Sequence, residues 1–227
     1  MKRVITVLLA ALLVLSLAAC GSGVETKKLA GTWTCTIDVT DRMNAAAEQA
    51  LGLSAADGTA QMPLQLVLTV TEDGAYTLRY DSDAARTALD AYAAALHPAA
   101  VESVYAAAEE QGFSREEYDA AMEKAGITMD DMVAAIFAGV DEEELLSLLT
   151  GRSAALTGYC RAEGGQLYLA DTAAELAETA DCLSYTLSDG TMTWTDAQGE
   201  LSSQLTEQEQ ELLRVPLTWT RQAEESK

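Results

Sequence analysis

The chain has 227 residues and is strongly acidic, with 36 Asp and Glu against 14 Lys and Arg and a formal net charge of -22. This length is sufficient for one large domain or two small ones with a buried core. The charge argues against nucleic acid as a partner, because phosphate recognition needs clustered Lys and Arg. The single histidine, His97, argues against His-rich metal sites and against most His-based acid–base chemistry.

The first twenty residues have the pattern of an export signal. Lys2 and Arg3 precede an uncharged and almost wholly apolar run over 4–19. These 16 residues fall short of the roughly 20 that a membrane-spanning helix needs, and such a run is typical of a signal peptide. The run ends in Leu17-Ala18-Ala19, and Cys20 follows.

The segment Leu17-Ala18-Ala19-Cys20 resembles the lipobox of bacterial lipoproteins. The resemblance implies that residues 1–19 are removed and that the sulfur of Cys20 carries a diacylglyceryl group with palmitate-type chains. Two acyl chains suffice for stable membrane attachment. We therefore expect a lipid-anchored protein of the cell membrane, or of the outer membrane in a diderm host, that faces away from the cytoplasm. The alternative is an ordinary cleaved signal in which small residues precede Cys20 by chance.

The mature chain starts with a short segment over 21–29, which is small and polar and which we predict to be a tether. Alternation of apolar and polar residues over 31–40 then predicts a half-buried strand. The same pattern over 64–70 leads through Thr71-Glu72-Asp73-Gly74, which indicates a hairpin, into a third strand over 76–80. The connection between the first two strands is predicted to hold a helix near 41–52.

Residues 81–150 are rich in alanine and are predicted to be helical. They contain 16 acids and 3 bases. Cap patterns at Ser114, Thr128 and Asp141, each three residues before an acid, indicate helix starts. Pro98 suits the first turn of a helix and therefore divides the block. The predicted helices are 83–96, 98–111, 115–125, 129–138 and 142–149.

Strand patterns resume after residue 150 and bring the predicted total to eight. We expect strands over 155–162, 166–170, 183–187, 192–194 and 215–221, and a short helix over 201–212. The count and the single apolar face predict a mainly β fold of the α+β class, in which an antiparallel meander barrel carries a helical insertion after the third strand. The alternative is a partial sheet with a separate helical bundle.

The barrel resembles the lipocalin-like domains of bacterial lipoproteins. Gly31-Thr32-Trp33 resembles the Gly-x-Trp motif that opens the first strand of that superfamily, and Glu72-Asp73-Gly74-Ala75-Tyr76 resembles its second hairpin. Arg221 is placed like the basic residue that packs over that tryptophan and closes the barrel. The implied organisation is a signal peptide over 1–19, an anchor and tether over 20–29, a barrel over 30–80 plus 151–222, a helical insertion over 81–150 and a tail over 223–227.

The interior of such a barrel is the candidate binding site. None of its predicted residues is charged, so we expect an apolar or aromatic ligand whose polar end meets Arg221 or a tyrosine hydroxyl. The alternative is a filled barrel, in which the acidic helices form the surface for a protein partner in the cell envelope. The predicted lining residues are Trp33, Ile37, Leu66, Leu68, Tyr76, Leu78, Tyr185, Trp194, Leu217 and Trp219. An apolar stripe on the helices (Ala91, Ala95, Tyr105, Met122, Met132, Ile136, Leu145 and Leu149) is predicted to cover one end of the barrel.

Three cysteines remain beside the lipidated one, which allows at most one disulfide. Cys35, Cys160 and Cys182 permit three pairings, and their spacing selects none of them. Cys35 shares the inward parity of Trp33, so we expect it to be a buried free thiol.

No catalytic or metal-binding motif is present in the sequence. The acids at 130–131 and 141–144 do not match the spacing of a calcium loop. Neither a Gly-x-Ser-x-Gly elbow, a phosphate-binding glycine loop nor a His-Glu-x-x-His motif occurs. We therefore expect a non-enzymatic protein without metal or cofactor.

Overall fold

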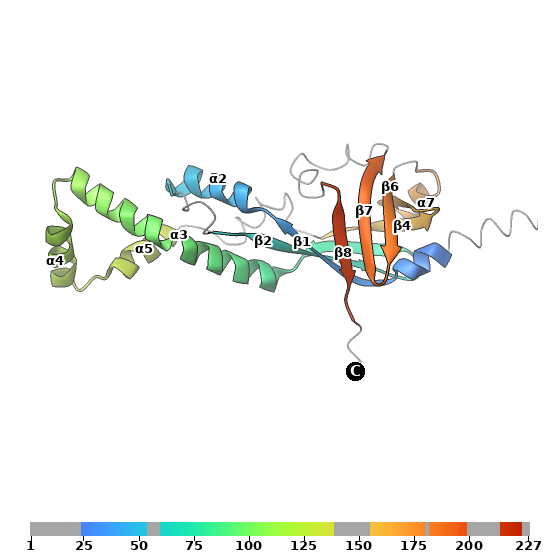
Figure 1. Ribbon diagram of the computed structural model, residues 1–227, viewed down its shortest axis with the longest axis horizontal. Helices are drawn as coiled ribbons and strands as arrows, with labels where there is room; N and C mark the ends of the chain where they lie inside the picture. The colour runs from blue at the N-terminus through green and yellow to red at the C-terminus, as the bar shows by residue number, and fades with distance from the viewer. Residues whose placement is uncertain (1–23, 54–59, 139–154, 180–181, 199–213, 224–227) are drawn as a thin grey trace, which may run out of the picture. The chain divides into compact units, whose positions relative to one another are not determined.

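A computed structural model describes residues 24–53, 60–138, 155–179, 182–198 and 214–223 of the chain. Its labelled elements are shown in Figure 1. The strands are β1 (Gly31–Asp38), β2 (Pro63–Val70), β3 (Ala75–Tyr80), β4 (Leu156–Glu163), β5 (Gln166–Ala170), β6 (Cys182–Ser188), β7 (Thr191–Gln198) and β8 (Leu217–Arg221). The helices are α2 (Thr40–Leu51), α3 (Ser82–Glu110), α4 (Arg115–Ala125), α5 (Met129–Phe137) and α7 (Ala173–Leu176).

The described strands form a closed antiparallel barrel in the order β1 to β8, which confirms the predicted eight-stranded meander. The barrel closes where β8 pairs with β1, with Trp33 opposite Arg221 and Thr34 opposite Thr220. A backbone bond of 2.8 Å from Gln222 to Thr32 continues this pairing. Closure leaves no unpaired sheet edge between the first and last strands.

The chain divides into two compact units. The first contains the described residues of 24–35, 66–80 and 155–223, and the second contains those of 36–65 and 81–138. The division falls within β1 and within β2. Each unit has its own buried residues, so each is described by itself below.

Alternation along the strands produces the core of the first unit. In β8, Leu217 and Trp219 are buried whereas Thr218 and Thr220 are exposed. All three tryptophans lie between two threonines in the sequence, and all three indoles are buried. The threonines beside them are exposed or partly exposed, which agrees with the preference of this β-branched residue for the solvent face of a strand.

The long helix α3 dominates the second unit and corrects the prediction of two helices divided at Pro98. It runs without interruption through this proline, from an Asp81 cap whose carboxylate accepts from the backbone N–H groups of Asp83 and Ala84. Pro98 lacks an N–H and frees the carbonyl of Ala94. Both residues lie on the exposed face, where water can bond that carbonyl.

The buried face of α3 also differs from the predicted stripe. Ala91 is exposed, and Ala95 and Tyr105 are only partly buried. The buried positions instead recur at intervals of four over most of the helix: Ala85, Tyr92, Leu96, Ala100, Val104 and Ala108. Ala100 packs with Leu53 and Val133 in a cluster that joins α3 to α5.

The predicted starts of the two following helices are confirmed. Ser114 and Glu117 form a reciprocal capping box at α4, and Thr128 and Asp131 form one at α5. Gly126, at a φ of 71°, ends α4 in the left-handed conformation that glycine adopts without strain. The helix predicted near 41–52 is confirmed as α2, whereas the helices predicted over 142–149 and 201–212 lie outside the described residues. No described helix is long and apolar enough to cross a membrane.

Residues 24–29 form a short helix, so the prediction of a tether over 21–29 is wrong for this part. Leu29 is 1% exposed and Thr26 is 7% exposed, and both pack against the barrel. The hydroxyl of Thr26 accepts a hydrogen bond of 3.0 Å from the backbone N–H of Ala162 in β4. Six residues are too few to show helical periodicity in the sequence, which is why composition alone suggested a tether.

Candidate functional site

Helix 24–29 lies at one end of the barrel strands (Figure 1). Its residues contact β4 and β8, which are four strands apart in the order of the closed barrel. Thr26 contacts β4, as described above, and the carbonyl of Ala30, just after the helix, accepts from Arg221 of β8 at 2.7 Å. The turns at 71–74, 164–165 and 189–190 join strands at this same end. We call the helix together with these three turns the closed end of the barrel.

Gly31, Trp33 and Arg221, the three predicted closure residues, lie together at the closed end. The guanidinium carbon of Arg221 is 4.4 Å from the centre of the Trp33 ring, at cation–π distance. The same guanidinium donates to the carbonyls of Lys28 and Ala30. A side chain at Gly31, whose φ is 132°, would come within 3.2 Å of it.

These bonds engage Arg221 outside the barrel interior, which argues against its predicted contact with the polar end of a ligand. The Trp33 indole is engaged as well, because its Nε1–H donates to the carbonyl of Leu29 at 2.8 Å. Trp33 therefore joins helix 24–29 to β1, and the indole nitrogen of Trp33 has a hydrogen-bond partner.

The burial of the ten predicted lining residues is uneven. Leu78 is only partly buried, and Ile37 is partly buried and belongs to the second unit. The remaining eight are buried, with exposures between 0% and 9%: Trp33, Leu66, Leu68, Tyr76, Tyr185, Trp194, Leu217 and Trp219.

Two of these tryptophans and one tyrosine form an aromatic group on neighbouring strands. Tyr185 of β6 is paired with Trp194 of β7, so their side chains share one face of the sheet. The ring centres of Trp194 and Trp219 are 4.8 Å apart with an interplanar angle of 48°. The Nε1–H groups of both indoles are buried and have no hydrogen-bond partner among the described residues.

A carboxylate of helix 24–29 lies near this aromatic group. Oε2 of Glu25 is buried and likewise has no hydrogen-bond partner in the part of the chain that the structure describes. The pKa of Tyr185 is raised, chiefly by burial, then by the nearby charge of Glu25, and then by the thiolate that Cys160 forms at high pH. We call Glu25, Tyr185, Trp194 and Trp219 the polar-aromatic cluster.

The three described cysteines are free and buried, so no disulfide links them. Burial raises the pKa of the Cys160 thiol to about 12. The pKa of Cys35 is also raised by burial, and a hydrogen bond with the backbone of Thr218 partly offsets this shift. Both thiols are therefore protonated at neutral pH and are poor nucleophiles.

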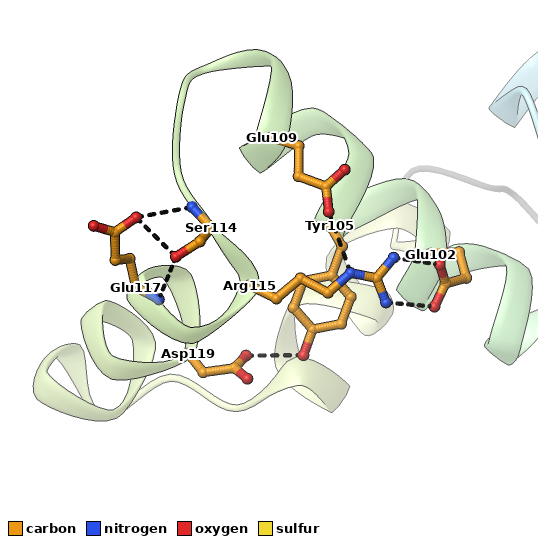
Figure 2. Close-up of polar contacts among 7 residues, drawn as sticks. All are labelled: Glu102, Tyr105, Glu109, Ser114, Arg115, Glu117 and Asp119. Carbon is orange, nitrogen blue, oxygen red and sulfur yellow. Dashed lines mark hydrogen bonds and ion pairs between the residues drawn. The ribbon is translucent and has the colours of Figure 1, made fainter.

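Many charged residues of the second unit have partners within it. Figure 2 shows Arg115 bound by both carboxylate oxygens of Glu102, at 2.7 and 3.0 Å, and by Glu109 at 3.3 Å. The guanidinium carbon of Arg115 lies 4.7 Å from the ring centre of Tyr105, whose hydroxyl donates to Asp119 at 2.8 Å. This network fixes the corner between α3 and α4.

The remaining acids do not assemble a metal site within the described residues. His97 bonds Asp130 at 3.1 Å, and Asp131 caps its own helix. No group of three or more His, Cys, Asp or Glu side chains is suitably placed for a metal ion in this part of the chain. The acids at 141–144 lie outside it.

Sequence reasoning missed three contributors to the barrel interior. Glu25 was missed because it lies in the segment that was predicted to be a tether. Gly158 lies opposite Tyr76, and a side chain there would come within 2.9 Å of the tyrosine hydroxyl, so the glycine makes room for this ring. Met192 is 0% exposed opposite Trp219, as the alternation in β7 could have indicated.

Comparison of the chain with protein-family models, curated proteins and solved structures finds no match.

Proposed function

We propose that the protein is an exported lipoprotein, anchored through Cys20, whose lipocalin-like barrel binds a small and mostly apolar molecule that carries a hydrogen-bond acceptor. The apolar part of the ligand lies against the buried aromatic and aliphatic side chains of the first unit. The acceptor pairs with the indole N–H groups of Trp194 and Trp219. Binding is the whole activity, and no catalytic step is included.

The observation that carries this proposal is the pair of buried indole N–H groups without partners. A buried donor that is left unpaired costs about 1–3 kcal/mol, so such groups are rare in folded proteins and need an explanation. Both belong to side chains that are at most 5% exposed, and their rings are in contact. A ligand acceptor shared between them removes this penalty in the bound state.

Glu25 refines the expected chemistry of the ligand. Its unpaired Oε2 accepts a hydrogen bond, so a ligand with a hydroxyl or an amine near its acceptor satisfies both sides of the polar-aromatic cluster. A carboxylate on the ligand is disfavoured, because it would face the charge of Glu25 in a medium of low dielectric constant.

The three tryptophans provide a matched test. Trp194→Phe and Trp219→Phe each remove an unpaired donor, whereas Trp33→Phe removes a donor that is bonded to Leu29. We expect each of the first two variants to bind an environment-sensitive naphthyl ketone dye about 2–10-fold more weakly, which corresponds to one hydrogen bond. Trp33→Phe should lower stability and leave dye affinity nearly unchanged. Equal affinity in all three variants would contradict a role for the two free indoles.

The anchoring is tested separately. We expect Cys20→Ala to move the exported protein from the membrane fraction to the soluble fraction, whereas Cys35→Ala should leave it membrane-bound. A Cys20→Ala protein that stays in the membrane fraction would contradict the lipoprotein assignment. It would leave the barrel proposal to be judged on dye binding.

A further inference from the structure

The outer face of helix 24–29 combines an apolar side chain with two basic ones. Val24 is 55% exposed, and Lys27 and Lys28 are exposed as well. Their spacing of three and four residues places them on one side of the helix. Thr26 and Leu29, in contrast, are buried against the barrel. An apolar residue beside lysines is typical of helices that lie at a membrane interface.

This face begins very close to the proposed anchor. Three residues, 21–23, separate Cys20 from Val24. Fully extended, they reach about 10 Å at roughly 3.3–3.6 Å per residue. The nine-residue tether expected from the sequence would have let the barrel turn freely, but a helix that is bonded to β4 and β8 leaves far less freedom.

We infer that the closed end of the barrel lies against the membrane, with Val24, Lys27 and Lys28 in contact with the lipid surface. The inference rests on the proposed lipidation of Cys20. Both lysines complement the phosphates of anionic headgroups, which attract basic residues that lie next to an anchor. The exposed apolar side chain of Val24 enters the boundary between headgroups and acyl chains.

The turns of the closed end limit the contact with the lipid surface to helix 24–29. They and the strand end beside them carry exposed acids, which anionic headgroups repel. These acids are Glu72, Asp73, Glu163 and Asp189. The barrel therefore rests on the outer face of helix 24–29 and does not sink to the level of its turns.

This orientation limits the route of the ligand. The end of the barrel that faces the bilayer is the end that helix 24–29 covers. A molecule dissolved in the membrane consequently cannot pass straight into the barrel through that end.

The test uses the full chain, lipidated in a bacterial host and reconstituted in phosphatidylglycerol-containing vesicles. A fluorophore is attached to a single added cysteine, either Glu72→Cys at the closed end or Asp171→Cys after β5, at the opposite end of the strands. The native thiols are buried and remain unlabelled. The five-residue strand β5, which ends just before Asp171, is about 17 Å long, so the two labels lie at clearly different depths. The probe is a lipid with a nitroxide on its headgroup.

We expect the nitroxide lipid to quench the label at residue 72 several-fold more than the label at residue 171. Lys27→Glu should reduce this difference, whereas Lys124→Glu, an identical change on the exposed face of α4, should not. Equal quenching of both labels in membrane-bound protein would overturn the inference but leave the anchoring intact. Recovery of the wild-type chain in the soluble fraction would instead refute the lipidation on which the inference rests.

Discussion

Leu29→Ala tests whether helix 24–29 is part of the barrel fold. Leu29 is 1% exposed, and its carbonyl holds the Trp33 indole. Truncation of a fully buried leucine removes its transfer free energy and leaves a cavity, which together cost about 2–5 kcal/mol. With a urea dependence of about 2 kcal/mol per molar, this loss lowers the unfolding midpoint by about 1–2.5 M.

Tryptophan fluorescence is a selective assay for this change. Trp33, Trp194 and Trp219 are the three tryptophans of the chain, and all belong to the barrel, so the signal follows the first unit. Val24→Ala in the same helix is the matched control, because Val24 is 55% exposed and its truncation should change stability by at most about 0.5 kcal/mol. Similar urea midpoints for both variants would show that residues 24–29 are a tether after all.

Two further predictions concern the barrel itself. Gly74→Ala should destabilise the barrel by about 2–4 kcal/mol, because Gly74 has a positive φ and the new side chain would clash with the carbonyl of Cys160. Gly164→Ala, the control, also places a side chain at a positive φ but in open space, so it should cost only about 1 kcal/mol. Equal losses of stability in urea unfolding would contradict the packing of the turn at Gly74. The raised pKa of Cys160 stabilises the fold fully below the thiol's ordinary pKa, and this contribution is lost as the pH rises from about 9 toward 12. We therefore expect the alkaline loss of stability to be smaller in Cys160→Ala, and an unchanged pH profile would count against a buried thiol.

The strands could be predicted from the sequence because each carries its own signal. Alternation over 31–38 or 217–221 follows directly from burial of one face, and short turns such as 164–165 determine which strands pair. Closure of the barrel was implied by the resemblance of Gly31-Thr32-Trp33 and Arg221 to the closing residues of lipocalin-like domains, and the parity shared by Trp219 and Arg221 agrees with it.

The structure differs from the predicted elements where the surroundings of a segment outweigh its local conformational preference. Pro98 disfavours a helix interior, yet its exposed position lets water bond the freed carbonyl while buried residues on the other face hold α3 together. Helix 24–29 is too short for its periodicity to be visible, and its stability comes from contacts with β4 and β8 that are far away in sequence.

The chemistry of the candidate site was the least predictable part. Sequence parity correctly indicated that Trp194 and Trp219 are buried, but the absence of a partner for their N–H groups depends on what surrounds each ring. The Trp33 indole, which lies in the same Thr-Trp-Thr context, has a partner because Leu29 happens to lie beside it. Identical local sequences thus gave different polar environments.

The central claim is that the barrel holds a removable small molecule, and native mass spectrometry of residues 21–227 tests it most directly. The protein is purified without detergent, incubated with an organic extract of bacterial cells, and measured before and after denaturing extraction. The account predicts a discrete added mass that extraction removes and that is reduced in the Trp194→Phe variant. The bare mass of the chain, both before and after incubation, would contradict it.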